Sequence, residues 1–327
     1  MSNKKKNNRK KKLLIPLFFS AFLLMTTSYA WFTANRMVAI DSLNVHVQAD
    51  GGLEVSTNAI DWKQVVTVAD IVDARQKYST SVNQIPDRMY PVSSGGNISN
   101  GKMELFVGNA TNSTDNSFIL VTERSTETES FGEESNGFFI AFDVFFRVKS
   151  PKELYIDGSS KVEYTADSTP GIENATRLAF LVEGTSDDNP NVSQGLNNAS
   201  KAIIWEPNYD SHTEYGVTHA LEVYGVSTSQ TGAALIPYDG VISEVNTSRN
   251  INLSAATASN YPDLFKRVNV DVSSPKSGGV NYKLFDLSPA VTKVRIYMWI
   301  EGQDVDCEDN ASYGDITFDL KFTINPS

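Results

Sequence analysis

The densest group of ligand-type oxygen atoms in the sequence lies between Glu301 and Asn310, just after a strongly alternating apolar stretch. The carboxylates of Asp304, Asp306 and Glu308 are two residues apart, so an extended chain would point them to the same side. Carboxylate oxygens are the ligands that Ca²⁺ prefers, which makes these three residues candidate calcium ligands. The alternative is an acidic turn held in solvent, because the glycine and terminal glutamate of an EF-hand loop are not at the required offsets. Calcium is the only cofactor that the sequence suggests.

The other reactive side chains form no recognisable catalytic motif. The three histidines are His46, His212 and His219, and no His-Glu-x-x-His pattern joins any two of them. The sequence also lacks a Gly-x-Ser-x-Gly nucleophile elbow and a phosphate-binding loop. Cys307 is the only cysteine, which rules out an internal disulfide. We interpret it as a partly buried, small apolar residue, with an intermolecular bridge or a reactive thiol as the alternative. We therefore predict that the protein is not an enzyme.

The N-terminus has the layout of an export signal. Seven basic residues within residues 4–12 precede the uncharged apolar run from Leu13 to Met25. Small residues at Ser28 and Ala30 then provide a signal-peptidase site, so cleavage after Ala30 would make Trp31 the first mature residue. The alternative is an uncleaved anchor, in which residues 13–35 cross the membrane once. Both alternatives place the rest of the chain outside the cytoplasm, secreted or on the cell surface.

The predicted mature chain is strongly acidic. The whole sequence has 28 Lys and Arg against 39 Asp and Glu, and seven of the basic residues lie in the leader, which leaves 21 minus 39, or −18. Such a charge keeps an exported protein soluble and excludes nucleic acid as a partner, because the phosphates would be repelled.

Alternating hydrophobicity dominates the exported part. Along Phe138–Val148 the even-numbered residues are all apolar, whereas the odd-numbered face also carries Asp143 and Arg147. The same alternation occurs at Val294–Glu301 and Ile316–Ile324. Further strands are predicted at Leu43–Val47, Leu53–Ser56, Met103–Val107, Phe118–Thr122, Leu154–Ile156, Leu178–Glu183 and Ala202–Trp205. Only the stretch near Val65–Lys77 has a helical period.

Many short strands and few helices predict an all-β, jelly-roll-like β-sandwich with long insertion loops and at most one or two short helices. We expect residues 1–30 to be the signal peptide or anchor and residues 31–327 to form one extracellular domain. The stretch around 187–260 is rich in Asn, Ser and Thr and is predicted to form loops. A domain boundary in that stretch is the alternative.

The segment Leu23–Thr33, with the sequence LLMTTSYAWFT, resembles the export junction of the camelysin and TasA-like matrix-fibre proteins of Gram-positive bacteria. In that family an apolar leader ends in an aromatic residue and Ala before further aromatic residues, the positions that Tyr29, Ala30, Trp31 and Phe32 hold here. The resemblance implies a jelly-roll subunit of an extracellular biofilm fibre that assembles by donor-strand exchange.

Two interpretations of the mature N-terminus remain open. In the first, an apolar segment completes the sheet of a neighbouring copy, and the protein self-assembles into an oligomer or fibre; the residues assigned to this role are Trp31, Phe32, Met37, Val38 and Ile40. In the second, the segment is an ordinary first strand of its own domain. The protein would then be a surface-anchored binding module or adhesin that recognises carbohydrate or protein. Four aromatic residues could stack on sugars or pack in the core: Trp62, Trp205, Trp299 and Tyr297.

Overall fold

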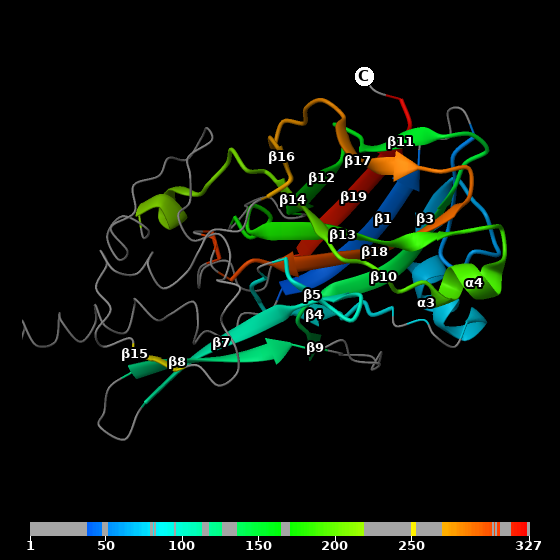
Figure 1. Ribbon diagram of the computed structural model, residues 1–327. Coiled ribbons are helices and arrows are strands. Elements are labelled where there is room, and N and C mark those ends of the chain that lie inside the picture. The colour runs from blue at the N-terminus through cyan, green and yellow to red at the C-terminus, as the bar shows by residue number, and fades with distance from the viewer. Residues whose placement is uncertain are drawn as a thin grey trace, which may run out of the picture.

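The computed structural model describes residues 38–47, 52–78, 81, 83–94, 96–112, 118–125, 136–164, 171–218, 250–252, 270–302, 304, 306–307 and 315–325. Most of the strands in these ranges belong to two large sheets, and Figure 1 shows β13, β18 and β10 crossing in front of β1 and β19.

The first sheet has eight strands and is built around β1 and β19. These two strands run parallel, and β19 also pairs with β11 and β12, whereas β1 also pairs with β3 and β4. The strands are β1 (Val38–Val47), β3 (Val65–Thr67), β4 (Arg88–Met89), β9 (Asn136–Gly137), β11 (Lys152–Ile156), β12 (Lys161–Tyr164), β17 (Tyr282–Leu287) and β19 (Asp315–Thr323).

The second sheet has six strands in the order β16-β14-β13-β18-β10-β2, and every pair is antiparallel except β14 with β16. These strands are β2 (Glu54–Ser56), β10 (Ile140–Arg147), β13 (Thr176–Ser186), β14 (Ala202–Pro207), β16 (Val272–Ser274) and β18 (Val291–Ile300). Two smaller sheets consist of β5 (Ile98–Ser99) with β6 (Lys102–Met103), and of β7 (Leu105–Asn112), β8 (Phe118–Ser125) and β15 (Asn250–Asn252).

Alternate residues of the two large sheets face each other and form the main core. Phe322 of β19 packs edge-on against Phe146 of β10 and Phe180 of β13, with ring centroids 5.3 and 5.8 Å apart. All three rings are buried, and such edge-to-face contacts are a favoured aromatic geometry. The apolar sides predicted for the strands therefore meet between the sheets, and the predicted all-β sandwich is confirmed.

A second cluster covers the opposite face of the six-stranded sheet. Tyr297 and Trp299 of β18 pack there with Phe139 and Leu181, which alternate in sequence with the residues of the main core. The six-stranded sheet is thus buried on both faces, because segments outside the sandwich also pack against it. This explains why the odd-numbered residues of β10 and β18, which lie on this second face, include large apolar side chains as well as charged ones.

The first described helix begins later than its sequence predicts. Residues 65–67 form β3, and α3 spans Val68–Lys77. Thr67 is the N-cap: its side chain accepts a hydrogen bond from the Asp70 N–H, and the Asp70 carboxylate accepts one from the Thr67 N–H. This capping box satisfies backbone donors that would otherwise lack partners, which sets the start of the helix.

The stretch predicted to form insertion loops contains regular structure in its described part. Pro190–Gly195 form α4, residues 202–207 form β14 inside the second sheet, and residues 214–218 form a helical turn. Pro190 stands in the first turn of α4, where its missing N–H costs nothing. The strand predicted at Ala202–Trp205 is confirmed, as are those within β1, β10, β13, β18 and β19.

Candidate functional site

The first candidate site is the N-terminal strand itself. β1 is hydrogen-bonded on both edges: it pairs in parallel with β19 from Ala39↔Asp315 to Val47↔Phe322, and on its other edge with β3 and β4. Val38 is paired with Met89, and Ile40 with Ile316. Within one chain, the segment predicted to mediate assembly therefore occupies the interior of the first sheet. Trp31, Phe32, Met37 and the cleavage site at Ala30 lie outside the described residues.

Gly52, five residues after the end of β1, has a backbone conformation that suits a change of direction. Gly51 and Gly52 follow the strand in sequence, and Gly52 has a φ of +93°, a conformation that favours glycine. No atom of the described residues lies within 4 Å of the position that a Cβ of Gly52 would occupy. This junction is therefore both tolerant of unusual backbone angles and uncrowded on that side.

The second candidate site is the acidic turn after β18. Asp304 and Asp306 are buried, with 4% and 1% of their surface exposed, and their ligand atoms lie within 4.8 Å of one another and of His212. The predicted alternative of a solvent-held turn is therefore wrong for these two residues. Glu308 lies outside the described residues. Cys307 is fully buried, which goes further than the partial burial that was predicted.

Protein groups already occupy most of the oxygen atoms of this cluster. Asp306 accepts hydrogen bonds from the backbone N–H and hydroxyl of Thr213, both at 2.8 Å, and it lies 2.8 Å from His212 Nδ1. Asp304 Oδ2 accepts a hydrogen bond from Arg177 Nη2 at 2.6 Å, and its Oδ1 accepts one from the Asp306 N–H at 2.9 Å. The helical turn at 214–218 is anchored to the cluster through Thr213, whose hydroxyl also accepts a bond from the Gly216 N–H.

Arg177 is the central cation of this region, and no sequence motif identified it. It is 3% exposed, and its Nη2 also lies 2.7 Å from Glu206 Oε1 on the neighbouring strand β14. Its Nη1 donates to the backbone carbonyls of Asn174 and Thr176. A buried guanidinium with this many acceptors holds the acidic turn against strands β13 and β14 of the second sheet.

The electrostatics of the cluster follow from burial and mutual repulsion. Burial raises the pKa of Asp304, and the nearby Asp306 carboxylate raises it further, whereas Arg177 opposes the shift. Burial lowers the pKa of His212, but its hydrogen bond to Asp306 and the charge of Asp304 outweigh burial and raise it overall. His212 Nε2 is buried and has no hydrogen-bond partner in the described part of the chain.

These contacts fit a protein ion-pair network better than a calcium site. Ca²⁺ takes six to eight oxygen ligands, whereas here a guanidinium occupies Asp304 and a histidine nitrogen lies against Asp306. The calcium site predicted at Asp304, Asp306 and Glu308 stays a prediction, and a test is given below.

The predicted aromatic platform is not present on the surface. Trp205 and Tyr297 have no exposed surface and Trp299 has 1%, so these rings pack in the interior. Trp62 is half-buried beneath Arg147, whose guanidinium carbon lies 4.1 Å from the ring centroid. The alternative in which these residues pack in the core is therefore the correct one for three of the four.

None of the helices in the described ranges is long and apolar enough to cross a membrane. Residues 13–35, the predicted membrane segment of an uncleaved leader, lie outside those ranges. Comparison with known protein families, with curated proteins and with solved structures found no match to this chain.

Proposed function

We propose that this protein is an exported structural subunit that assembles with copies of itself by exchanging its N-terminal strand, forming an extracellular fibre or matrix. The observation that carries the proposal is the position of β1, the first described strand, between β19 and the two short strands β3 and β4. The export signal and the acidic mature chain support the same function, because both suit a protein that works outside the cell.

Exchange of such a strand costs little energy within the sheet. Removing β1 would leave the long edge of β19 without its hydrogen-bond partners, and an open edge binds another extended segment readily. A β1 strand from a second copy would restore the same register, so exchange changes few contacts within the sheet. The main cost is the entropy of association, which makes exchange dependent on concentration. Gly52 provides a hinge five residues after the strand.

A cross-strand disulfide distinguishes exchange from an ordinary first strand. Ser42 and Thr317 are paired across β1 and β19, so Ser42→Cys with Thr317→Cys places two thiols opposite each other. Both cysteines are introduced into a chain that carries Cys307→Ser, so that the native thiol cannot form a disulfide. In a chain starting at Trp31, we expect oxidation at high protein concentration to give covalent multimers on a non-reducing gel. Disulfides found only within single chains, at every concentration where the protein stays soluble, would overturn the proposal.

A peptide experiment tests whether the place that β1 occupies between β19 and β3 can bind a separate strand. A chain lacking residues 1–47 should bind a synthetic peptide of residues 38–47 and regain stability on binding. The matched control is the same peptide with Val45→Pro, because proline removes a backbone N–H and is excluded from central strands. Val45 is paired on both edges, with Leu320 and Val66, so the control peptide should not bind.

Export can be tested independently of assembly. We expect the protein recovered from outside the cells to begin at Trp31, as measured by mass spectrometry of the intact chain. A mature chain that retains residues 1–30 would instead identify the leader as an anchor, and recovery of the protein only from the cytoplasm would overturn the export proposal.

A further inference from the structure

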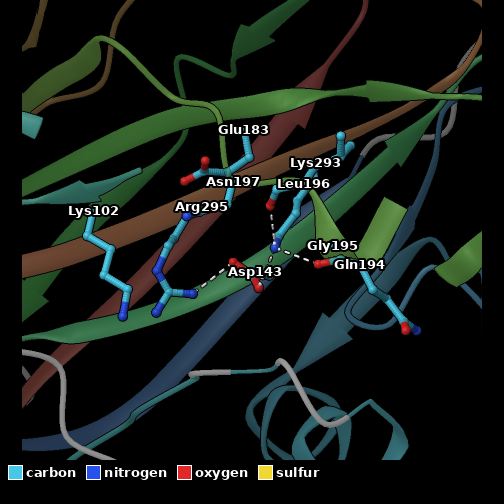
Figure 2. Close-up of a pocket in the computed structure, with 9 residues that line it drawn as sticks. All are labelled: Lys102, Asp143, Glu183, Gln194, Gly195, Leu196, Asn197, Lys293 and Arg295. Atoms are coloured by element: carbon cyan, nitrogen blue, oxygen red, sulfur yellow. Dashed lines mark hydrogen bonds and ion pairs between the residues drawn. The ribbon is translucent and has the colours of Figure 1, made fainter. Parts of the chain in front are cut away.

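The outer face of the six-stranded sheet contains a cavity of about 250 Å³ that involves neither β1 nor its partner strands. Its floor is formed by three neighbouring strands, β10, β18 and β13, and its rim by β6, the last residues of α4 and the segment that follows α4. The lining residues are Lys102, Asp143, Glu183, Gln194, Gly195, Leu196, Asn197, Lys293 and Arg295. Figure 2 shows Lys293 and Arg295 extending from the same strand toward Asp143.

The floor of the cavity is a fixed network of charges. Asp143 is 1% exposed, and it accepts hydrogen bonds from Arg295 Nη1 and the Tyr78 hydroxyl, both at 2.8 Å. Lys293 Nζ lies 3.3 Å from Asp143 and donates to the carbonyls of Gln194 and Leu196 at 2.9 Å. These bonds join the sheet to the covering segment and hold the cavity open without a ligand.

Glu183 is placed on the cavity wall by an irregularity in β13. The register of β13 against β18 shifts between Val182 and Gly184, so Glu183 is the extra residue of a β-bulge. Gly184 has a φ of +132°, which favours glycine at this point of the strand. Bulges redirect side chains and are frequent beside binding sites.

One carboxylate oxygen of Glu183 has a partner and the other does not. Oε2 accepts a hydrogen bond from the Ala199 N–H at 3.0 Å, whereas Oε1 is buried and has no partner in the described part of the chain. Glu183 is only 1% exposed, and an unsatisfied buried acceptor costs about 1–3 kcal/mol. Burial also raises the pKa of Glu183, to about 7. A ligand that donates a hydrogen bond to Oε1 would remove this cost.

The charge of the lining favours a singly charged anion. Lys102, Lys293 and Arg295 contribute three positive charges, and Asp143 and Glu183 contribute two negative ones, which gives +1 when Glu183 is ionised. A phosphate dianion would exceed this net charge and would be repelled by Asp143 and Glu183, whereas a ligand with a single carboxylate would balance it. Lys102 is exposed at the mouth, where it can meet an entering carboxylate.

The size and polarity of the lining favour a small hydroxylated ligand. The cavity is smaller than the range of about 300–1,000 Å³ typical of drug-sized ligands. Leu196 is the only apolar side chain on its described wall, and no aromatic ring lines it for stacking. The Asn197 amide and Glu183 instead provide partners for hydroxyl groups, whereas the Gln194 amide extends away from Asp143 and donates to the Asn58 carbonyl (Figure 2).

We propose that this cavity binds a small sugar acid, with the ligand carboxylate directed toward Lys102 and Arg295 and a ligand hydroxyl donating to Glu183 Oε1. The proposal goes beyond the assembly function, because it assigns the subunit a ligand. It does not depend on strand exchange, since the cavity and β1 share no residue.

The test uses three probes that separate the contribution of the ligand carboxylate from that of the ligand hydroxyl groups. Isothermal titration calorimetry of the purified protein is carried out with D-glucuronate, with D-glucose, which lacks the carboxylate, and with cyclohexanecarboxylate, which lacks the hydroxyls. We expect only D-glucuronate to bind. No binding of D-glucuronate up to about ten millimolar would overturn the proposal, and so would equal binding of either of the other probes.

A conservative variant tests the role of Glu183. Glu183→Gln keeps an oxygen to accept from the Ala199 N–H but removes the ionisable carboxylate, and we expect D-glucuronate affinity to fall at least about tenfold. The matched control is Glu163→Gln, which removes an exposed carboxylate on β12 away from the cavity and should leave affinity unchanged. Unfolding midpoints establish that both variants are folded. Unchanged affinity in Glu183→Gln, or an equal loss in both variants, would overturn the assignment.

Discussion

Asp143 on β10 and Arg295 on β18 are paired directly across the strands, and their side chains form a buried ion pair at 2.8 Å. Burial by itself would raise the pKa of Asp143, but Arg295 and Lys293 outweigh it and lower the pKa, so the carboxylate is charged in the folded protein. Burial also raises the pKa of Tyr78 far above its ordinary value, with a further contribution from Asp143, so Tyr78 remains a neutral donor to this carboxylate.

We first predict that Asp143→Asn lowers the free energy of unfolding by about 3–5 kcal/mol, because it leaves two buried cations without a counter-charge. Tyr78→Phe removes one hydrogen bond to the same carboxylate and should cost only about 1–3 kcal/mol. Urea unfolding monitored by tryptophan fluorescence measures both. A smaller loss for Asp143→Asn than for Tyr78→Phe would contradict the central role of the ion pair.

The second prediction concerns the pH dependence that Glu183 gives to stability. Burial, with repulsion from Asp143, raises its folded-state pKa from 4.5 to about 7 despite the opposing Ala199 N–H, Lys293 and Arg295. The folded state therefore binds this proton more tightly than the unfolded state does. The resulting stabilisation is fully present below about pH 4.5 and is lost as the pH rises through about 7.

Glu183→Gln cannot titrate and should lack this loss. Relative to the native protein, the variant should gain roughly 1–3 kcal/mol in unfolding free energy between about pH 4.5 and pH 8, after allowance for screening at the cavity mouth. Denaturant unfolding at the two pH values measures the change, and parallel pH profiles for the two proteins would contradict it.

The third prediction tests the packing between the two large sheets. Phe322→Ala should lower the unfolding free energy by about 3–5 kcal/mol, because it removes the ring that contacts both Phe146 and Phe180. Phe285→Ala on β17 is the matched control: its ring is only half-buried beside the same core, so the loss should be about 1 kcal/mol. Equal losses would show that Phe322 does not join the sheets as the structure indicates.

The fourth prediction decides between an ion-pair network and a calcium site after β18. We expect the same melting temperature in Ca²⁺ and in chelator, because Arg177 already neutralises Asp304. Asp306→Asn should lower the unfolding free energy by about 2–3 kcal/mol in both conditions, since the donors from Thr213 and His212 lose a charged acceptor. A rise in melting temperature with Ca²⁺ that Asp306→Asn abolishes would instead establish the calcium site.

Local sequence patterns were sufficient to locate most of the principal strands. The alternation at Ile140–Val148 and Val294–Glu301 correctly assigned the core-facing residues, because a strand points successive side chains to opposite faces. Phe138 was assigned to the same face but precedes β10 and packs against the cluster on the opposite face. The start of α3 was misplaced by three residues, since Val65–Thr67 fits the helical period but pairs with β1 instead. The spacing of apolar residues within one segment does not show whether that segment pairs with a strand elsewhere in the chain.

The sequence by itself determined that Asp143 and Arg295 lie on the polar sides of two strands, and that Asp304 and Asp306 lie in one acidic turn. Only the tertiary structure decided that Asp143 faces Arg295, that Arg177 reaches the acidic turn, and that the bulge at Glu183 aims a carboxylate into a cavity. The physical reason is that side-chain alternation is a property of each strand alone. Register, bulges and burial depend on which strands become neighbours, and residues more than a hundred positions apart in the chain set those neighbours here.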